Sequence, residues 1–209
     1  MRVTVNHSTD IIHGLKGPRA VKNPFESERL IYRCYEPEDF ETVLELHSNP
    51  QVYLNGQSSV PKPVTKKTIE EINKHVEDVM LNLIICKKAV EDGIPEPIGR
   101  FILATNLPQA FHIRSIELGI ELKVEAQGQG YGTEALQWAL EWCFHNANFH
   151  RVQLSVFGWN LYAYNVYKRV GFVEEGRLRD ALFYDGKYWD TIRMSILEVE
   201  WRTKYLAAT

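Results

Sequence analysis

The sequence predicts a mixed α/β domain (α+β class), and two observations carry this prediction. Residues 116–124 alternate between apolar and polar side chains, which is typical of a strand with one buried face. After a turn rich in glycine, apolar residues recur at helical spacing from Ala135 to Cys143. No repeat or internal linker interrupts the chain. We therefore expect one domain at residues 25–209, preceded by an N-terminal arm at residues 1–24.

Composition places few limits on function. Of the 209 residues, 44% are hydrophobic and 24% charged, which is ordinary for a globular protein with a sizeable core. A formal net charge of -3 gives no sign of binding to nucleic acid or to an anionic membrane. The three cysteines are widely spaced and no two histidines have ligand spacing, so we expect free buried thiols and no metal site. These features favour a cytoplasmic or nuclear protein, either a monomer or a homodimer.

The chain ahead of the alternating strand is expected to supply three strands and two helices. They are a strand at 29–35, a helix from Pro37 to about 50, a helix from Thr65 to about Leu81, and adjacent antiparallel strands at 83–86 and 100–105. Between the two helices, residues 55–63 are expected to form a loop because they contain prolines and serines.

The second half adds the alternating strand, the helix that follows the glycines, and four further elements. These are a strand at 152–157, a short helix at 161–169 closed by Gly171, and strands at 172–183 and 188–197. Asp185-Gly186 between the last two strands is typical of a hairpin turn. The expected order is therefore β-α-α-β-β-β-α-β-α-β-β.

The glycine-rich turn, Gln127 to Thr133, is the first candidate for a binding site. A glycine loop that leads into a helix presents backbone N–H groups and the positive end of the helix dipole to an anion, commonly phosphate. The turn lacks the Lys-Ser or Lys-Thr of a P-loop, and the third glycine of a dinucleotide fingerprint would fall at Thr133. A purely structural turn remains the alternative.

Three local motifs together resemble the GNAT acyltransferases over roughly residues 28–197. Gln127, Gly130 and Gly132 fit the pyrophosphate signature Q/R-x-x-G-x-G/A. Residues 160–172 look like N-x-x-[AS]-x-x-x-Y-x-K-x-G-F with the lysine one place earlier. Residues 175–194 are similar to the close of the ribosomal-protein N-terminal acetyltransferases and the spermidine N-acetyltransferases.

The resemblance implies a GNAT fold, whose central, mostly antiparallel, twisted sheet splays apart between its fourth and fifth strands and is flanked by helices. It also implies that acetyl-CoA binds along the splayed strand and the glycine turn. The residues expected to hold acetyl-CoA are Ile120, Glu121, Leu122, Gln127, Gly128, Gln129, Gly130, Tyr131, Gly132, Thr133, Asn160, Ala163, Tyr167 and Lys168.

Two residues are expected to carry the chemistry of acetyl transfer. By resemblance Tyr167 is the general acid, and a phenol of reference pKa ~10 is protonated at neutral pH. Glu117, near the start of the alternating strand, is the candidate base, directly or through water, and Glu121 shares its face. The implied acceptor is a primary amine: a small amine such as a polyamine, or a protein N-terminus. A non-catalytic acyl-CoA-binding sensor or scaffold is the competing function.

Overall fold

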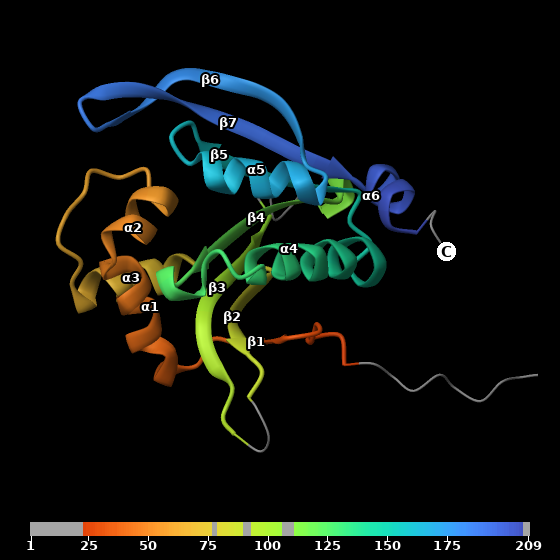
Figure 1. Ribbon diagram of the computed structural model, residues 1–209, viewed down its shortest axis with the longest axis horizontal. Helices are drawn as coiled ribbons and strands as arrows, with labels where there is room; N and C mark the ends of the chain where they lie inside the picture. Colours follow the sequence, from red (N-terminus) through yellow and green to blue (C-terminus); the bar gives the residue numbers. More distant parts are fainter. Residues whose placement is uncertain (1–22, 77–78, 90–92, 106–110, 207–209) are drawn as a thin grey trace, which may run out of the picture.

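The computed structural model describes residues 23–76, 79–89, 93–105 and 111–206. The expected N-terminal arm lies outside these residues except for Asn23 and Pro24. The described chain forms a seven-stranded sheet with helices on both faces (Figure 1). This arrangement confirms the expected mixed α/β class. None of the helices within the described ranges is long and apolar enough to cross a membrane.

The strands follow the order β1-β2-β3-β4-β5-β7-β6 across the sheet, and all neighbours are antiparallel except β4 and β5. Their bounds are β1 Leu30–Cys34, β2 Leu81–Lys87, β3 Glu96–Ala104, β4 Ser115–Leu122, β5 Arg151–Phe157, β6 Val173–Tyr184 and β7 Lys187–Leu197. The predicted hairpin is confirmed, because Asp185 and Gly186 turn between β6 and β7 with φ values of 50° and 77°.

The helices are α1 Phe40–Ser48, α2 Pro50–Gly56, α3 Lys66–His75, α4 Tyr131–Glu141, α5 Leu161–Val170 and α6 Glu198–Tyr205. As predicted, α4 opens directly out of the glycine turn, and Gly171 ends α5 with a φ of 121°. The expectation that the helix after Thr65 continues to about Leu81 is wrong, because α3 ends at His75 and Leu81 already pairs with β3.

The helix α2 was not expected from the sequence, since Asn49-Pro50 resembles a helix end. In the structure this dipeptide begins a new helix. The Asn49 side chain accepts hydrogen bonds from the N–H groups of Gln51 and Val52, at 3.0 and 3.4 Å. Pro50 occupies the first turn, where its missing N–H has no consequence.

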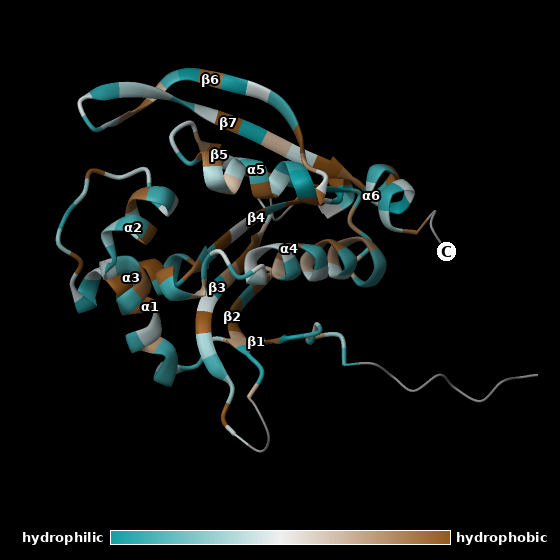
Figure 2. Cartoon of the chain, in the orientation of Figure 1, coloured by the Kyte–Doolittle hydropathy of each residue, from teal (hydrophilic) through white to brown (hydrophobic). Residues whose placement is uncertain are grey.

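Two hydrophobic clusters lie on opposite faces of the sheet. Along β2, Leu83 and Ile85 belong to the larger cluster with α4 and α5, whereas Ile84 and Cys86 belong to a smaller one with α1 and α3. In Figure 2, hydrophobic residues lie along β2 and β3 and most of β6 is hydrophilic. The expected buried free thiols are found at Cys86 and Cys143, but Cys34 at the end of β1 is exposed.

The helix α6, also not expected from the sequence, completes the larger cluster beside the end of α5. Trp201 is 5% exposed, and its ring lies 5.5 Å from that of Phe144. The Tyr205 hydroxyl donates a hydrogen bond to the carbonyl oxygen of Val170 at 2.7 Å, and Lys204 donates to that of Arg169 at 2.7 Å. These two side chains supply partners for carbonyls that the end of α5 leaves unpaired.

Replacing Trp201 with alanine is expected to lower the free energy of unfolding by about 3–5 kcal/mol, since it removes a buried aromatic side chain and leaves a cavity. Urea denaturation measures the change. The matched control is Val199→Ala on the same helix, where the side chain is 61% exposed and a change within about 0.5 kcal/mol is expected. Equal effects of the two substitutions would contradict the assignment of Trp201 to the core.

Candidate active site

The parallel pairing of β4 and β5 is short. Only Ser115, Ile116 and Glu117 pair with β5, opposite Arg151, Val152 and Gln153, whereas β4 remains paired with β3 as far as Leu122. The two strands therefore separate after residue 117, as the sequence resemblance implied. Beyond that point the edge of β4 that faces β5 has no strand partner, so its backbone groups are available to a ligand.

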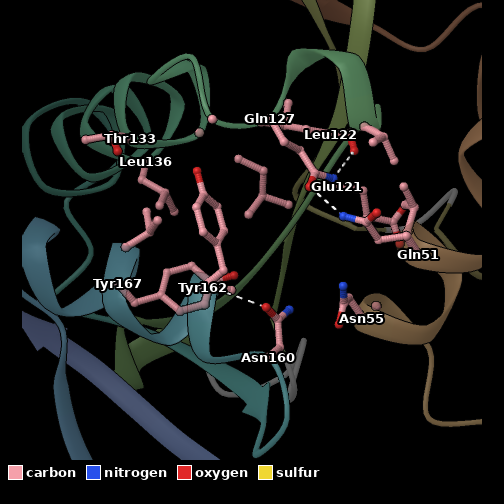
Figure 3. A pocket seen from close by; sticks show the side chains of 18 of the residues that line it. Gln51, Asn55, Glu121, Leu122, Gln127, Thr133, Leu136, Asn160, Tyr162 and Tyr167 are labelled. Atoms are coloured by element: carbon pink, nitrogen blue, oxygen red, sulfur yellow. Dashed lines mark hydrogen bonds between the residues drawn. The ribbon is translucent and has the colours of Figure 1, made fainter.

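A cavity of about 550 Å³ opens where the strands separate. Its walls are α2, the end of β4, the glycine turn, the first turns of α4, and α5. The residues that line it are Gln51, Val52, Asn55, Gly56, Ile120, Glu121, Leu122, Val124, Gln127, Gly128, Gly130, Gly132, Thr133, Leu136, Asn160, Tyr162, Ala163, Val166 and Tyr167. Figure 3 shows the two tyrosines of α5 across the cavity from Gln51 and Asn55 of α2.

Most of the residues predicted for acetyl-CoA binding come together in this cavity, and four predicted site residues do not line it. Gln129 and Tyr131 belong to the turn but face away, with the ring of Tyr131 4.5 Å beneath the guanidinium of Arg29. Lys168 is exposed and lies over the ring of Tyr164 at 5.4 Å. Glu117 lies in the short segment where β4 pairs on both sides, away from the cavity lining.

The glycine turn offers a row of backbone donors. The N–H of Gln127 donates to the carbonyl oxygen of Val124 at 3.1 Å. Within the described chain, the N–H groups from Gly128 to Thr133 donate to no carbonyl or side chain. Gly128 and Gly130 have φ values of 73° and 84°, which L side chains rarely adopt. Together with the N-terminus of α4, this donor set fits a diphosphate.

The turn is held in place from two sides. On one side, Glu134 of α4 accepts hydrogen bonds from the Ser27 hydroxyl and the Arg29 side chain, each at 2.7 Å, and Arg29 also donates to the Gln129 carbonyl at 3.0 Å. Burial alone would raise the pKa of Glu134, but these donors outweigh it and the pKa is lowered. The carboxylate therefore stays ionised, and it ties the start of α4 to the chain just before β1.

On the other side, the side chain of Gln127 joins the turn to β4 and α2. Its amide nitrogen donates to the carbonyl oxygen of Leu122 at 3.0 Å, and its amide oxygen accepts from Gln51 at 3.3 Å. The glutamine of the sequence motif thus fixes the position of the turn through its side chain. Its backbone N–H, already paired, is not part of the free donor row.

The opposite wall is α5. Asn160 caps this helix by accepting a hydrogen bond from the N–H of Ala163 at 3.1 Å. Tyr167 is half-buried against the edge of Phe172, with ring centroids 5.9 Å apart. Its hydroxyl forms no hydrogen bond with any described residue, and burial raises the pKa of Tyr167 to about 12. The cavity therefore contains a phenol that remains protonated well above neutral pH.

The cavity residues that the sequence did not suggest come chiefly from α2. They are Gln51, Val52, Asn55 and Gly56, with Val124, Leu136, Tyr162 and Val166 from the elements already considered. A reading of Asn49-Pro50 as a helix start would have predicted α2, but nothing in the sequence indicates that α2 packs beside the end of β4.

Comparison with known proteins identifies the family of the chain. Residues 29–173 match the model of the acetyltransferase (GNAT) domain. The spermidine N(1)-acetyltransferase of Vibrio cholerae is 30% identical over 180 residues, 86% of this chain and 97% of that protein. That of Escherichia coli K12 is 32% identical over 174 residues, 83% of this chain and 88% of that protein.

Solved structures of similar proteins have the same fold. The crystal structure of the V. cholerae spermidine N-acetyltransferase in complex with CoA and spermine has a TM-score of 0.70 and 29% identity, and the match covers 83% of this chain and 98% of that one. A GNAT acetyltransferase from Bacillus anthracis has a TM-score of 0.69 at 24% identity, with 84% and 99% covered, and shows likeness of fold.

Replacing Gly128 with valine is expected to weaken binding of CoA at least about tenfold, the equivalent of one lost hydrogen bond to a charged group (~1.5 kcal/mol), because the side chain would stand beside the free donor row. Calorimetry with CoA measures the affinity. Gly186→Val in the distant hairpin is the matched control, since both glycines have φ values near 75° and open space around an added Cβ. We expect both substitutions to lower the free energy of unfolding by a similar amount and only Gly128→Val to lose affinity for CoA. If Gly128→Val keeps its affinity for CoA, the turn is structural.

Proposed function

Because the chain belongs to the GNAT family of acetyltransferases, we propose that it transfers the acetyl group of acetyl-CoA to a small aliphatic primary amine. Acetyl transfer from acetyl-CoA to an amine is the activity supported by the family and the named relatives. A non-catalytic sensor or scaffold is not favoured. The size of the acceptor and the residues that act on it are the new part of this proposal.

The residues present fit acetyl-CoA, which supplies an acetyl group already activated as a thioester. The N–H groups from Gly128 to Thr133 and the N-terminus of α4 would bind its diphosphate. The unpaired edge of β4, residues 119–122, would pair with its amide-bearing arm as an added strand does. A backbone N–H of this edge is also suited to the negative charge that develops on the carbonyl oxygen.

The contacts of Trp159 support a small acceptor. Its indole N–H donates to the carbonyl oxygen of Leu54 in α2 at 3.3 Å. Its ring lies 4.7 Å from that of Tyr184 in β6 and 6.0 Å from that of Trp189 in β7. Trp159 therefore joins α2 to the last hairpin. An extended peptide would need the groove between these elements to be open, whereas a slender amine would not.

The proposed reaction is direct attack by the amine nitrogen on the thioester carbonyl. Tyr167 lines the cavity, and because its pKa is raised to about 12 its phenol carries a proton at neutral pH that it can donate to the departing sulfur. None of the described residues that line the cavity is a cysteine, which accords with transfer that has no acyl-enzyme intermediate.

Thiol release from acetyl-CoA in the presence of different acceptors tests the proposal. The panel contains spermidine, spermine, a free L-amino acid and a tetrapeptide with a free N-terminus. We expect the highest kcat/KM with a polyamine, in line with the spermidine acetyltransferases to which the chain is similar. Faster acetylation of the tetrapeptide would overturn the small-acceptor proposal. Tight CoA binding without release of thiol from acetyl-CoA in the presence of any acceptor would instead favour a sensor.

Tyr167→Phe is expected to lower kcat by ~10²-fold, since it removes the proton donor but keeps the ring, and to leave the Kd for CoA within about twofold. The control is Tyr164→Phe, because the Tyr164 hydroxyl donates to Glu174 at 2.8 Å and lies outside the cavity lining. A pKa of about 12 also predicts that kcat does not fall between pH 7 and pH 10 through loss of the Tyr167 proton. Unchanged turnover would remove Tyr167 from the reaction.

Trp159→Ala is expected to open the groove between α2 and the hairpin. The ratio of kcat/KM for the tetrapeptide to that for spermidine should then rise by about tenfold, or ~1.4 kcal/mol. Trp159→Phe is the control, because it keeps a ring in the aromatic cluster and removes only the hydrogen bond to Leu54. If this ratio of kcat/KM values is the same in the wild type, Trp159→Ala and Trp159→Phe, then Trp159 does not restrict the acceptor.

A further inference from the structure

A buried group of charged side chains lies behind one wall of the cavity. Glu121 is the acidic residue among the described residues that line the cavity. Directly opposite it across the β3–β4 pair is Arg100, which is 1% exposed. From α1, His47 is 3% exposed and its Nε2 lies 3.4 Å from the Glu121 carboxylate. Glu121 thus connects the cavity to buried ionisable side chains.

Two atoms of this group have no hydrogen-bond partner in the described chain. Arg100 donates to Asn82 at 2.9 Å and to Asn73 at 3.0 Å, but its Nη1 is buried without an acceptor. The Oε2 atom of Glu121 is also buried without a donor, because His47 approaches it outside hydrogen-bond geometry. Unpaired buried charged atoms are unfavourable and call for an explanation. Because Glu121 also lines the cavity, a cationic group that enters it would offset the charge of this carboxylate.

Burial keeps His47 neutral. Burial lowers the pKa of His47, Arg100 lowers it further, and the opposing effect of Glu121 is smaller than the sum. Gln57, the residue that follows α2, donates a hydrogen bond to Oε1 of Glu121 at 3.4 Å. Lys123, which follows β4, is paired with Glu45 at 2.6 Å. His47 is therefore an unprotonated imidazole beside a carboxylate at neutral pH.

A primary ammonium of reference pKa ~10.4 is about 99.9% protonated at pH 7, so the acceptor must lose a proton before it reacts. We propose that Glu121 binds the acceptor's ammonium group and that His47 takes up this proton through Glu121. This proposal rests on the function proposed above. Glu121 would touch the substrate, whereas His47 would act through it.

The ammonium N–H bond breaks, its electron pair stays on nitrogen, and the proton passes by way of the Glu121 carboxylate to Nε2 of His47. The free nitrogen pair forms the bond to the thioester carbonyl carbon, the C–S bond breaks with its electron pair on sulfur, and Tyr167 gives this sulfur a proton. The nitrogen loses its second proton, which replaces the one that Tyr167 gave up. His47 then releases its proton to solvent, so each turnover yields an amide, a thiol and one proton.

Substitution of the carboxylate tests the contact with the acceptor. Glu121→Gln keeps the size of the side chain and is expected to lower kcat/KM for spermidine by ~10²-fold at pH 7, with the Kd for CoA within about twofold. Glu45→Gln is the matched control, since this carboxylate is on α1 but pairs with Lys123. The proposal is overturned if Glu121→Gln is as active as Glu45→Gln. It is also overturned if Glu117→Gln is inactive while Glu121→Gln keeps its activity.

The pH profile tests the role of His47. A site that binds the ammonium and removes its proton gives a kcat/KM that is flat from pH 7 to about pH 9 and falls as pH drops through the lowered pKa of His47. In His47→Asn the reaction would depend on amine that is already neutral. Its kcat/KM should then rise about tenfold per pH unit towards pH 10. The same rise in the wild-type protein would overturn the proposal.

A binding measurement gives a readout that does not require turnover. The His47 ring is titrated by NMR in the complex with CoA, with and without spermidine. Spermidine at Glu121 offsets the carboxylate charge that raises the pKa of His47, so this pKa should fall further in the wild type and stay unchanged in Glu121→Gln. No change in the wild type would overturn the contact. If the wild type acetylates no amine at all, the proposed function fails instead.

Discussion

The parallel pairing between β4 and β5 ends after three residues, and the other features of the site follow from this separation. β4 leads into the glycine turn and α4, and β5 leads into Asn160 and α5, so two helix N-termini meet at the opening. A strand edge in the middle of a sheet leaves backbone groups without partners, and these groups favour a ligand that carries amides of its own.

The half of the site proposed to bind acetyl-CoA is built from local signals, so its elements could be located from the sequence. Alternation of side chains located β4, glycine at positions of positive φ located the turn, and Asn160 marked the start of α5. Each of these signals needs only neighbouring residues. Gln129, Tyr131 and Lys168 were assigned to the site with them, but whether a turn residue faces the cavity depends on Arg29 and the rest of the fold.

The proposed acceptor half depends on contacts between distant parts of the chain, and the sequence did not predict it. His47, Arg100 and Glu121 come from α1, β3 and β4 and meet only through the strand register and the packing of α1. A period of two places Glu117 and Glu121 on one face and cannot distinguish them. The end of the β4–β5 pairing does so, because it lies between the two residues.

The burial of Arg100 has a consequence for how this part of the protein can change during evolution. In a relative with an apolar residue at position 121, the buried guanidinium of Arg100 would have no opposite charge from that position, which is strongly unfavourable. Loss of Arg100 alone would leave the carboxylate in the same condition. We therefore expect homologues to keep both residues or to lose both, so that covariation between the two positions, more than conservation of either, records their relation.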